Sequence, residues 1–168
     1  MPLSIGKVSD PRSDHVLGHT RLLVKYRGIE SMAMLDSGVG ISIATKLVWI
    51  KWGKPTLYKV CMSLQLADGS LNTPLGLVED ITVESCGIQY SHTFAIVDFG
   101  ESTNYEVILG RPFMRQFKML QDWGFDYLYL RQETSVTRVN LKNHSYRNVI
   151  ALPVEEFDFA SFEGIFSS

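Results

Sequence analysis

The chain has 168 residues, of which 45% are hydrophobic and 20% are charged. This composition is that of a globular protein and excludes a disordered or collagen-like chain. Because 16 basic and 18 acidic residues leave a net charge of −2, the chain has no basic excess with which to hold a phosphate backbone, and we expect no direct nucleic-acid partner.

Two cysteines and the lack of long apolar runs bear on the cellular compartment. Cys61 and Cys86 cannot build a disulfide framework and lack the paired spacing of a zinc site. We therefore expect buried thiols in a reducing compartment, cytosolic or nuclear, and no metal site. No apolar run approaches the roughly 18 residues of a membrane span, and the N-terminal sequence lacks the apolar core of a signal peptide, so no membrane partner is expected.

The composition divides the chain into three parts. Residues 1–19 are polar and interrupted by prolines and glycines, which is typical of a flexible arm. Residues 20–131 carry the apolar patterns of a folded domain. Residues 132–168 are predicted to be a C-terminal extension that begins with a strand and ends in a tail of acidic residues alternating with phenylalanine. Such a tail is either disordered or docked on a partner.

The first predicted elements are a hairpin and a helix. Residues 20–35 alternate apolar and polar side chains around Arg27 and Gly28, which predicts a β-hairpin with its turn at this dipeptide. Residues 42–52 combine good helix formers with apolar residues at mixed spacing, which predicts a short helix that ends before Gly53.

Strand patterns dominate the rest of the chain. Short apolar stretches separated by turn residues occur within residues 64–66, 75–77, 81–83 and 88–96, and this spacing is typical of a barrel or sandwich. After Glu106, an apolar run closes on Gly110 and leads into a short predicted helix at Pro112. Two more strands are predicted over 120–130 and 134–141. The fold class is therefore mainly β, with one or two short helices.

One tripeptide carries the clearest chemical signal. Asp36, Ser37 and Gly38 directly follow the apolar run of the first hairpin, which puts a carboxylate in a tight loop where backbone amides can hold it. Alone, the triplet is weak, because Asp, Ser and Gly are common turn residues. The segment from Glu106 to Met114 strengthens it, since it places an apolar strand, a glycine and an arginine about seventy residues downstream.

With these blocks together, the sequence resembles the retropepsin-like aspartic proteases, most closely those in the polyproteins of gypsy-type long-terminal-repeat retrotransposons. Three blocks match in order, namely MLDSG, LADGSLNTPLG and VILGRPFM, and the resemblance covers about residues 21–131. It implies a closed acid-protease barrel that works as a homodimer. It also implies no cofactor, because cleavage is by activated water, and a peptide or polyprotein substrate.

The resemblance assigns roles to individual residues. Asp36 would be the catalytic aspartate, Ser37 would fix the active-site loops through its hydroxyl, and Gly38 would offer its carbonyl to the substrate backbone. A second set of residues would bind or support the substrate site. Ala67, Asp68 and Gly69 would lie at or near the flap that closes over a peptide, while Gly110 and Arg111 would belong to the helix beneath the active site.

The single triplet has a structural consequence. Aspartic-protease chemistry uses two carboxylates that share one proton, one to deprotonate a water and one to protonate the scissile carbonyl. Because the sequence holds a single Asp-Ser/Thr-Gly, each subunit of a homodimer would supply one Asp36, and the monomer would be inactive. The pair would titrate as a unit, which predicts a bell-shaped pH profile on the acid side of neutral.

Two positions depart from the family pattern. Val39 stands where a small residue usually follows the triplet, which narrows the space beside the scissile bond and puts specificity, or activity itself, in question. Gly40 stands where many retroviral relatives carry an acidic residue that pairs with the arginine of the Gly-Arg block. We therefore expect Arg111 to find another partner, either Asp122 or the other subunit.

Other residues are assigned structural roles. His92 is expected to be a hydrogen-bonded, half-buried histidine rather than a catalytic base. The aromatic residues from Trp123 to Tyr129 are expected to pack in a core or a dimer interface rather than to form a ligand platform. Readings as a serine or cysteine hydrolase are discarded, since Ser37 and the histidines show no triad-like spacing.

The sequence thus predicts a homodimeric aspartic endopeptidase that cleaves extended segments of the polyprotein encoding it. One alternative is a retropepsin-like fold that acts as a non-catalytic dimerisation or interaction module. A further alternative is a plain β-barrel in which the triplet is a coincidence. A dimer that brings the two Asp36 carboxylates within hydrogen-bond reach would favour the enzyme over the module.

Overall fold

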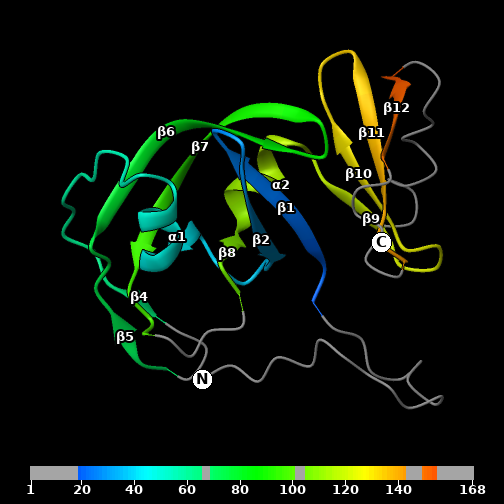
Figure 1. Cartoon of the computed structure of the whole chain (residues 1–168). Coiled ribbons are helices and arrows are strands. Elements are labelled where there is room, and N and C mark those ends of the chain that lie inside the picture. Colours follow the sequence, from blue (N-terminus) through cyan, green and yellow to red (C-terminus); the bar gives the residue numbers. More distant parts are fainter. Residues whose placement is uncertain (1–18, 66–68, 101–104, 143–148, 155–168) are drawn as a thin grey trace. The chain divides into compact units, whose positions relative to one another are not determined.

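The computed structural model describes residues 19–65, 69–100, 105–142 and 149–154 (Figure 1). They divide into two units, the first ending at Phe113 and the second beginning at Met114. The predicted arm 1–19 and the tail after residue 154 fall almost wholly outside the described residues. The predicted domain boundary at residue 131 stays an expectation from the sequence.

Six strands of the first unit form a closed barrel in which neighbouring strands are hydrogen-bonded. In barrel order they are β1 (Arg21–Tyr26), β2 (Ile29–Leu35), β8 (Val107–Leu109), β3 (Ser42–Thr45), β7 (Ile88–Val97) and β6 (Gly76–Ser85). A pairing of Lys25 with Glu84 joins β1 to β6 and closes the ring. The prediction of a mainly β fold with a closed barrel is confirmed.

The first hairpin lies where the sequence predicts it. β1 and β2 pair antiparallel from Arg21 opposite Met34 to Tyr26 opposite Ile29, which leaves a two-residue loop. Both loop residues have positive φ, 48° at Arg27 and 83° at Gly28, the geometry that suits the right-handed twist of paired strands. The strand β1 alternates half-buried and buried residues, so one face lies in the core.

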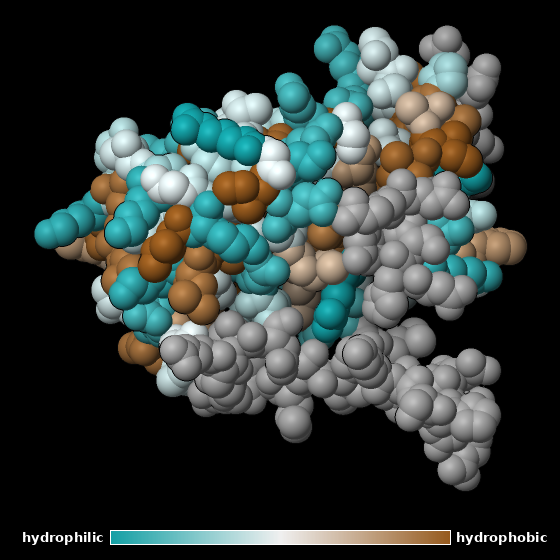
Figure 2. All heavy atoms as spheres, in the orientation of Figure 1, coloured by the Kyte–Doolittle hydropathy of each residue, from teal (hydrophilic) through white to brown (hydrophobic). Residues whose placement is uncertain are grey.

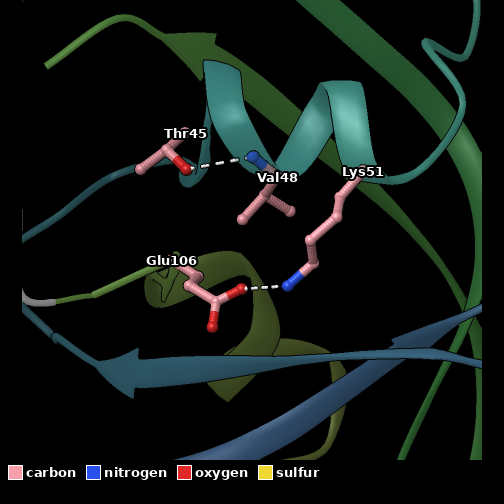
Figure 3. Close-up of polar contacts among 4 residues, drawn as sticks. All are labelled: Thr45, Val48, Lys51 and Glu106. Carbon is pink, nitrogen blue, oxygen red and sulfur yellow. Dashed lines mark hydrogen bonds and ion pairs between the residues drawn. The ribbon is translucent and has the colours of Figure 1, made fainter. Parts of the chain in front are cut away.

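The helix predicted over residues 42–52 is wrong in its first part. Residues 42–45 form β3, because this fully buried segment pairs with both β7 and β8. The helix α1 (Lys46–Lys51) begins only after Thr45, whose side-chain oxygen accepts a hydrogen bond from the Val48 amide at 3.3 Å (Figure 3). Pairing with two neighbouring strands outweighs the helix propensity of residues such as Ala44.

A second contact shown in Figure 3 ties α1 to the strand β8. The Lys51 ammonium lies 2.7 Å from the Glu106 carboxylate, and both side chains are partly exposed. The Thr45 amide donates to the Glu106 carbonyl at 3.0 Å. The residue just before β8 is therefore held by both its backbone and its side chain.

Aromatic side chains fill one part of the barrel core. Phe94 has no exposed surface, and its ring lies 5.4 Å from that of Trp52 and 5.1 Å from that of His92, measured between centroids. Phe113, at the end of the first unit, is equally buried and lies against Tyr90. On the surface in view, hydrophobic and hydrophilic residues are interspersed (Figure 2).

A short hairpin and a short helix complete the first unit. The hairpin pairs β4 (Leu64–Gln65) with β5 (Leu71–Asn72). The helix α2 (Arg111–Gln116) follows β8 where the sequence predicts it and runs across the division between the units. No helix among the described residues is long and apolar enough to cross a membrane.

The second unit is an antiparallel sheet of four strands. In sheet order they are β12 (Val149–Pro153), β11 (Ser135–Asn140), β10 (Tyr127–Arg131) and β9 (Leu120–Asp122). The single strand predicted over 120–130 is wrong, because a turn at residues 123–126 splits it. The Asp122 carboxylate makes this turn by accepting hydrogen bonds from the amides of Gly124 and Phe125.

Two further sequence expectations are corrected in this sheet. Residues 149–153, where the sequence predicts no strand, form the strand β12, which pairs along β11. Core packing of the aromatic residues is right for Tyr129, which is buried, but wrong for Trp123 and Phe125, whose side chains are 65% and 66% exposed. Their place in a dimer interface stays a prediction.

The two cysteines differ, although the sequence predicts both to be buried. Cys61 is exposed, because it lies in the irregular segment between α1 and β4. Cys86 lies in the tight turn between β6 and β7, and burial raises the pKa of its thiol from 9.0 to about 12.

We expect Cys61 to react with iodoacetamide at least about tenfold faster than Cys86 near neutral pH, because the thiolate is the nucleophile and burial keeps Cys86 protonated. Mass spectrometry of the native protein after timed labelling measures both rates. Equal rates in the folded protein would contradict this, and unfolding in urea should equalise them.

We expect Phe94→Ala to lower the free energy of unfolding by about 3–5 kcal/mol, because it leaves a cavity between Trp52 and His92 that the surrounding barrel residues cannot fill. Leu71→Ala is the control, since Leu71 is 71% exposed and its truncation should change stability by less than about 0.5 kcal/mol. Urea unfolding followed by circular dichroism measures both. A small loss in Phe94→Ala would show that the core is not closely packed there.

Candidate functional site

The triplet and the Gly-Arg pair meet because two strands run parallel. Leu35 at the end of β2 lies opposite Leu109 at the end of β8, so the residues that follow each strand leave the barrel side by side. The Asp36 amide donates to the Leu109 carbonyl at 3.0 Å, and the Arg111 amide donates to the Val39 carbonyl at 2.8 Å. The two blocks predicted to belong to one site are therefore joined by backbone hydrogen bonds.

The Asp36 carboxylate is oriented by its own loop. Its Oδ1 accepts a hydrogen bond from the Gly38 amide at 2.8 Å, and a side chain at Gly38 would place a carbon 3.1 Å from the same oxygen. Asp36 is half-buried, whereas Ser37 and Gly38 are exposed. The carboxylate is thus fixed by a backbone donor in a loop that stays open to solvent.

The same local geometry occurs at two other aspartates. Asp98 Oδ1 accepts from the Gly100 amide at 3.0 Å, and Asp122 Oδ1 accepts from the Gly124 amide at 3.0 Å. Each is an aspartate followed two residues later by a glycine, the ordinary pattern of an Asx turn. What sets Asp36 apart is therefore its place at the paired ends of β2 and β8.

Gly110 lies where two backbone segments come together. A β-carbon there would lie 2.6 Å from the Val39 carbonyl oxygen and 2.8 Å from that of Ile41. Both distances are shorter than real β-carbons show, and the atoms in the way belong to the main chain. This explains the role that the sequence assigns to Gly110 as a structural support: it lets β8 pass directly beneath the loop that carries Asp36.

A buried polar pair, Ser42 and His92, lies next to this close approach of Gly110 to the loop. The sequence analysis does not predict the role of Ser42. The Gly110 amide donates to Ser42 Oγ at 3.1 Å, and Ser42 Oγ is hydrogen-bonded to His92 Nε2 at 2.7 Å. His92 is only 5% exposed, so the prediction of a hydrogen-bonded histidine is confirmed and its burial is deeper than expected. No local motif marks Ser42, because its partners lie 50 and 68 residues away.

Arg111 lies over the loop at the residues that follow Asp36. Its Nη1 donates to the Ser37 carbonyl at 3.4 Å, and its Nη2 lies 3.1 Å from where a β-carbon at Gly40 would be. The guanidinium therefore uses the space that a side chain at position 40 would fill. Asp122, one of its predicted partners, belongs to the second unit, and that pairing stays a prediction.

An apolar cluster borders the site. Its buried members come from β2, β3, β7 and β8, and half-buried hydrophobic residues pack against them; the latter are Val39, Ile41, Leu64, Leu77, Phe99 and Tyr105. The rings of Phe99 and Tyr105 meet edge to face, with centroids 6.0 Å apart. We call the half-buried residues of this cluster the apolar wall. Burial raises the pKa of the Tyr105 phenol, and the Asp36 carboxylate raises it further, so the apolar wall lies within the electrostatic reach of Asp36.

The predicted flap is described only in part. Ala67 and Asp68 lie outside the described residues. Gly69 is exposed and has a φ of 84°, and the strands on either side of this segment pair antiparallel, with Leu64 opposite Asn72. The hairpin is confirmed, and its closure over a peptide stays a prediction. The described residues hold no cluster of three or more His, Cys, Asp or Glu side chains that could bind a metal ion.

We expect Gly110→Ala to lower the free energy of unfolding by about 1–3 kcal/mol, because its methyl group overlaps two carbonyl oxygens and forces the loop of Asp36 to shift. Gly40→Ala is the matched control in the same site. Its methyl group meets only the mobile end of Arg111, so stability should stay within about 0.5 kcal/mol of wild type. Urea unfolding of both variants measures the difference, and equal stabilities would refute the close approach at Gly110.

Comparison with known proteins identifies the architecture. No family model matches the sequence, and no curated protein matches it. Among solved structures, the chain is similar to the crystal structure of the retroviral protease-like domain of Ddi1 from Leishmania major, with a TM-score of 0.54 and 16% identity over 84% of this chain and 100% of that one. The chain therefore has a retropepsin-like fold, a mainly β structure with a closed barrel and two short helices, as the sequence predicts.

Proposed function

We propose that the chain is an aspartic endopeptidase, active as a homodimer in which each subunit supplies one Asp36. Its substrate would be an extended peptide segment of a retrotransposon polyprotein, as the sequence resemblance implies. The observation that carries the proposal is the place of Asp36: a half-buried carboxylate at the paired ends of β2 and β8 in a retropepsin-like barrel.

The geometry around Asp36 suits a reacting carboxylate. The Gly38 amide fixes Oδ1 at 2.8 Å, and the exposed Ser37 and Gly38 leave the loop accessible to a peptide. The apolar wall that includes Val39 and Tyr105 lowers the local dielectric, which strengthens charge interactions between reacting groups. A carboxylate that served only to make a turn would need none of these surroundings.

The proposed reaction needs a second carboxylate close to the first. In the dimer, the ionised Asp36 of one subunit would take a proton from a water molecule while the protonated Asp36 of the other gave its proton to the scissile carbonyl oxygen. The water oxygen would then bond to the carbonyl carbon and form a tetrahedral diol. The Asp36 that took the proton from water would then give it to the amide nitrogen, while the other Asp36 took a proton back from a diol hydroxyl, so that the C–N bond breaks and an acid and an amine are released.

Substrate binding would use backbone contacts. The Gly38 carbonyl would accept a hydrogen bond from the peptide, and the hairpin of β4 and β5 would close over it and add hydrogen bonds of the kind found between strands. The apolar wall would then receive a hydrophobic side chain, with Val39 limiting its size.

We expect Asp36→Asn to reduce kcat/KM by at least about a thousandfold, because the variant cannot exchange the shared proton. Cleavage of an unbiased peptide mixture between about pH 4 and pH 7 measures this, and wild type should show a bell-shaped profile. Asp98→Asn is the matched control, because Asp98 makes the same turn with Gly100 but follows β7 rather than β2.

Sedimentation of the same samples tests the dimer. Activity that tracks the dimer and vanishes in Asp36→Asn supports the proposal. A folded dimer that cleaves nothing, in wild type and variant alike, would instead favour a non-catalytic dimerisation or interaction module. Activity that survives in Asp36→Asn would rule out the assignment of Asp36.

A further inference from the structure

We propose that Arg111 is a specificity-determining residue that selects peptides with an acidic side chain, Asp or Glu, within a few residues of the scissile bond. The inference rests on the proposed peptidase function, since it names the substrate class of that same site. It comes from the charge and position of one side chain that the fold alone does not explain.

The guanidinium lies on the loop that carries Asp36. Arg111 is exposed, its Nη1 lies 3.4 Å from the Ser37 carbonyl oxygen, and its Nη2 lies above Gly40. Since Gly38 and Gly40 are exposed and have no side chains, an extended peptide that runs along this loop would meet the guanidinium directly.

Within the described part of the first unit, no ion pair balances the positive charge of Arg111. Three lysines of the first unit pair with carboxylates, at 3.5 Å for Lys25, 3.7 Å for Lys46 and 2.7 Å for Lys51. Among the described residues of that unit, no carboxylate forms an ion pair with Arg111. One long bond to a carbonyl leaves most of its five N–H donors available for a planar, bidentate partner, which a carboxylate supplies.

Helix stability does not explain the position of this arginine. Arg111 is the first residue of α2, and the first turn of that helix has no acidic residue. A cation at this end is opposed by the helix dipole, which favours anions there.

The neighbouring apolar wall completes the preference. Val39 lies between Gly38 and Gly40 and packs against the apolar cluster, as Tyr105 does. A fitting peptide would therefore combine a hydrophobic residue for the wall with an acidic residue for Arg111. Asn or Gln would have the same shape as the acidic residue without its charge, which gives a matched comparison.

Cleavage-site profiling with an unbiased peptide mixture tests the proposal. At about pH 6, where acidic side chains are ionised, wild type should cleave with Asp or Glu enriched at one position. Two peptides that differ only by Glu or Gln at that position give a direct comparison. In wild type, kcat/KM for the Glu peptide should be about ten times that for the Gln peptide, and in Arg111→Gln the two values should be nearly equal. Arg111→Lys should keep part of the preference, and Arg111→Glu should shift it towards Lys and Arg.

Controls separate selection from a structural role. Arg115→Gln removes an exposed charge from the same helix and should leave the Glu-to-Gln ratio as in wild type. Arg111→Gln should lower cleavage of the Glu peptide about tenfold more than cleavage of the Gln peptide. A structural role would lower cleavage of both peptides equally.

Three outcomes would overturn the proposal. Cleavage by wild type without an acidic preference, or a preference that survives in Arg111→Gln, would remove this inference and leave the proposed peptidase intact. Loss of the dimer in Arg111→Gln with the ratio unchanged would assign Arg111 to the partner subunit's carboxylate instead. Failure of wild type to cleave any peptide would overturn the proposed function and this inference together.

Discussion

The parallel pairing of β2 with β8 is the constraint on which the rest of the site depends. It sets Leu35 opposite Leu109, so that Asp36 and Gly110, the next residue along each chain segment, lie side by side. The crossing is possible because Gly110 has no side chain: its α-carbon lies too close to the main chain at Val39 and Ile41 for any other residue. The position of the carboxylate thus follows from a backbone contact rather than from side-chain packing.

That crossing needs a polar support, and the buried pair of Ser42 and His92 supplies it. The hydroxyl of Ser42 satisfies the Gly110 amide, which would otherwise be buried without a partner near the loop. His92 in turn holds the hydroxyl and packs among the aromatic rings that include Phe94. A polar network and an aromatic core therefore both hold the main chain at Gly110 in place. The loop of Asp36 is thus rigid at its base, while its outer residues stay exposed.

What the sequence could predict follows from how local each signal is. The first hairpin depends on alternation and a two-residue turn, and both are present within sixteen residues. The sequence of β3 predicts a helix, whereas its conformation is decided by pairing with β7 and β8, whose residues lie far along the chain. The Asx turn at Asp36 recurs at Asp98 and Asp122, so turn chemistry alone could not single out the site. The order of three sequence blocks carried information that no local pattern held.

Gly40 shows how one departure from a family pattern changes meaning once the structure is known. In the sequence, the missing acidic residue implies that Arg111 needs another partner. In the structure, the missing side chain gives room to the Arg111 guanidinium, and none of the described carboxylates of the first unit forms an ion pair with it. A paired charge is held by its partner, whereas an exposed and unbalanced charge is available to a ligand. Under the proposed function, the same substitution leaves Arg111 available to an acidic residue of the substrate.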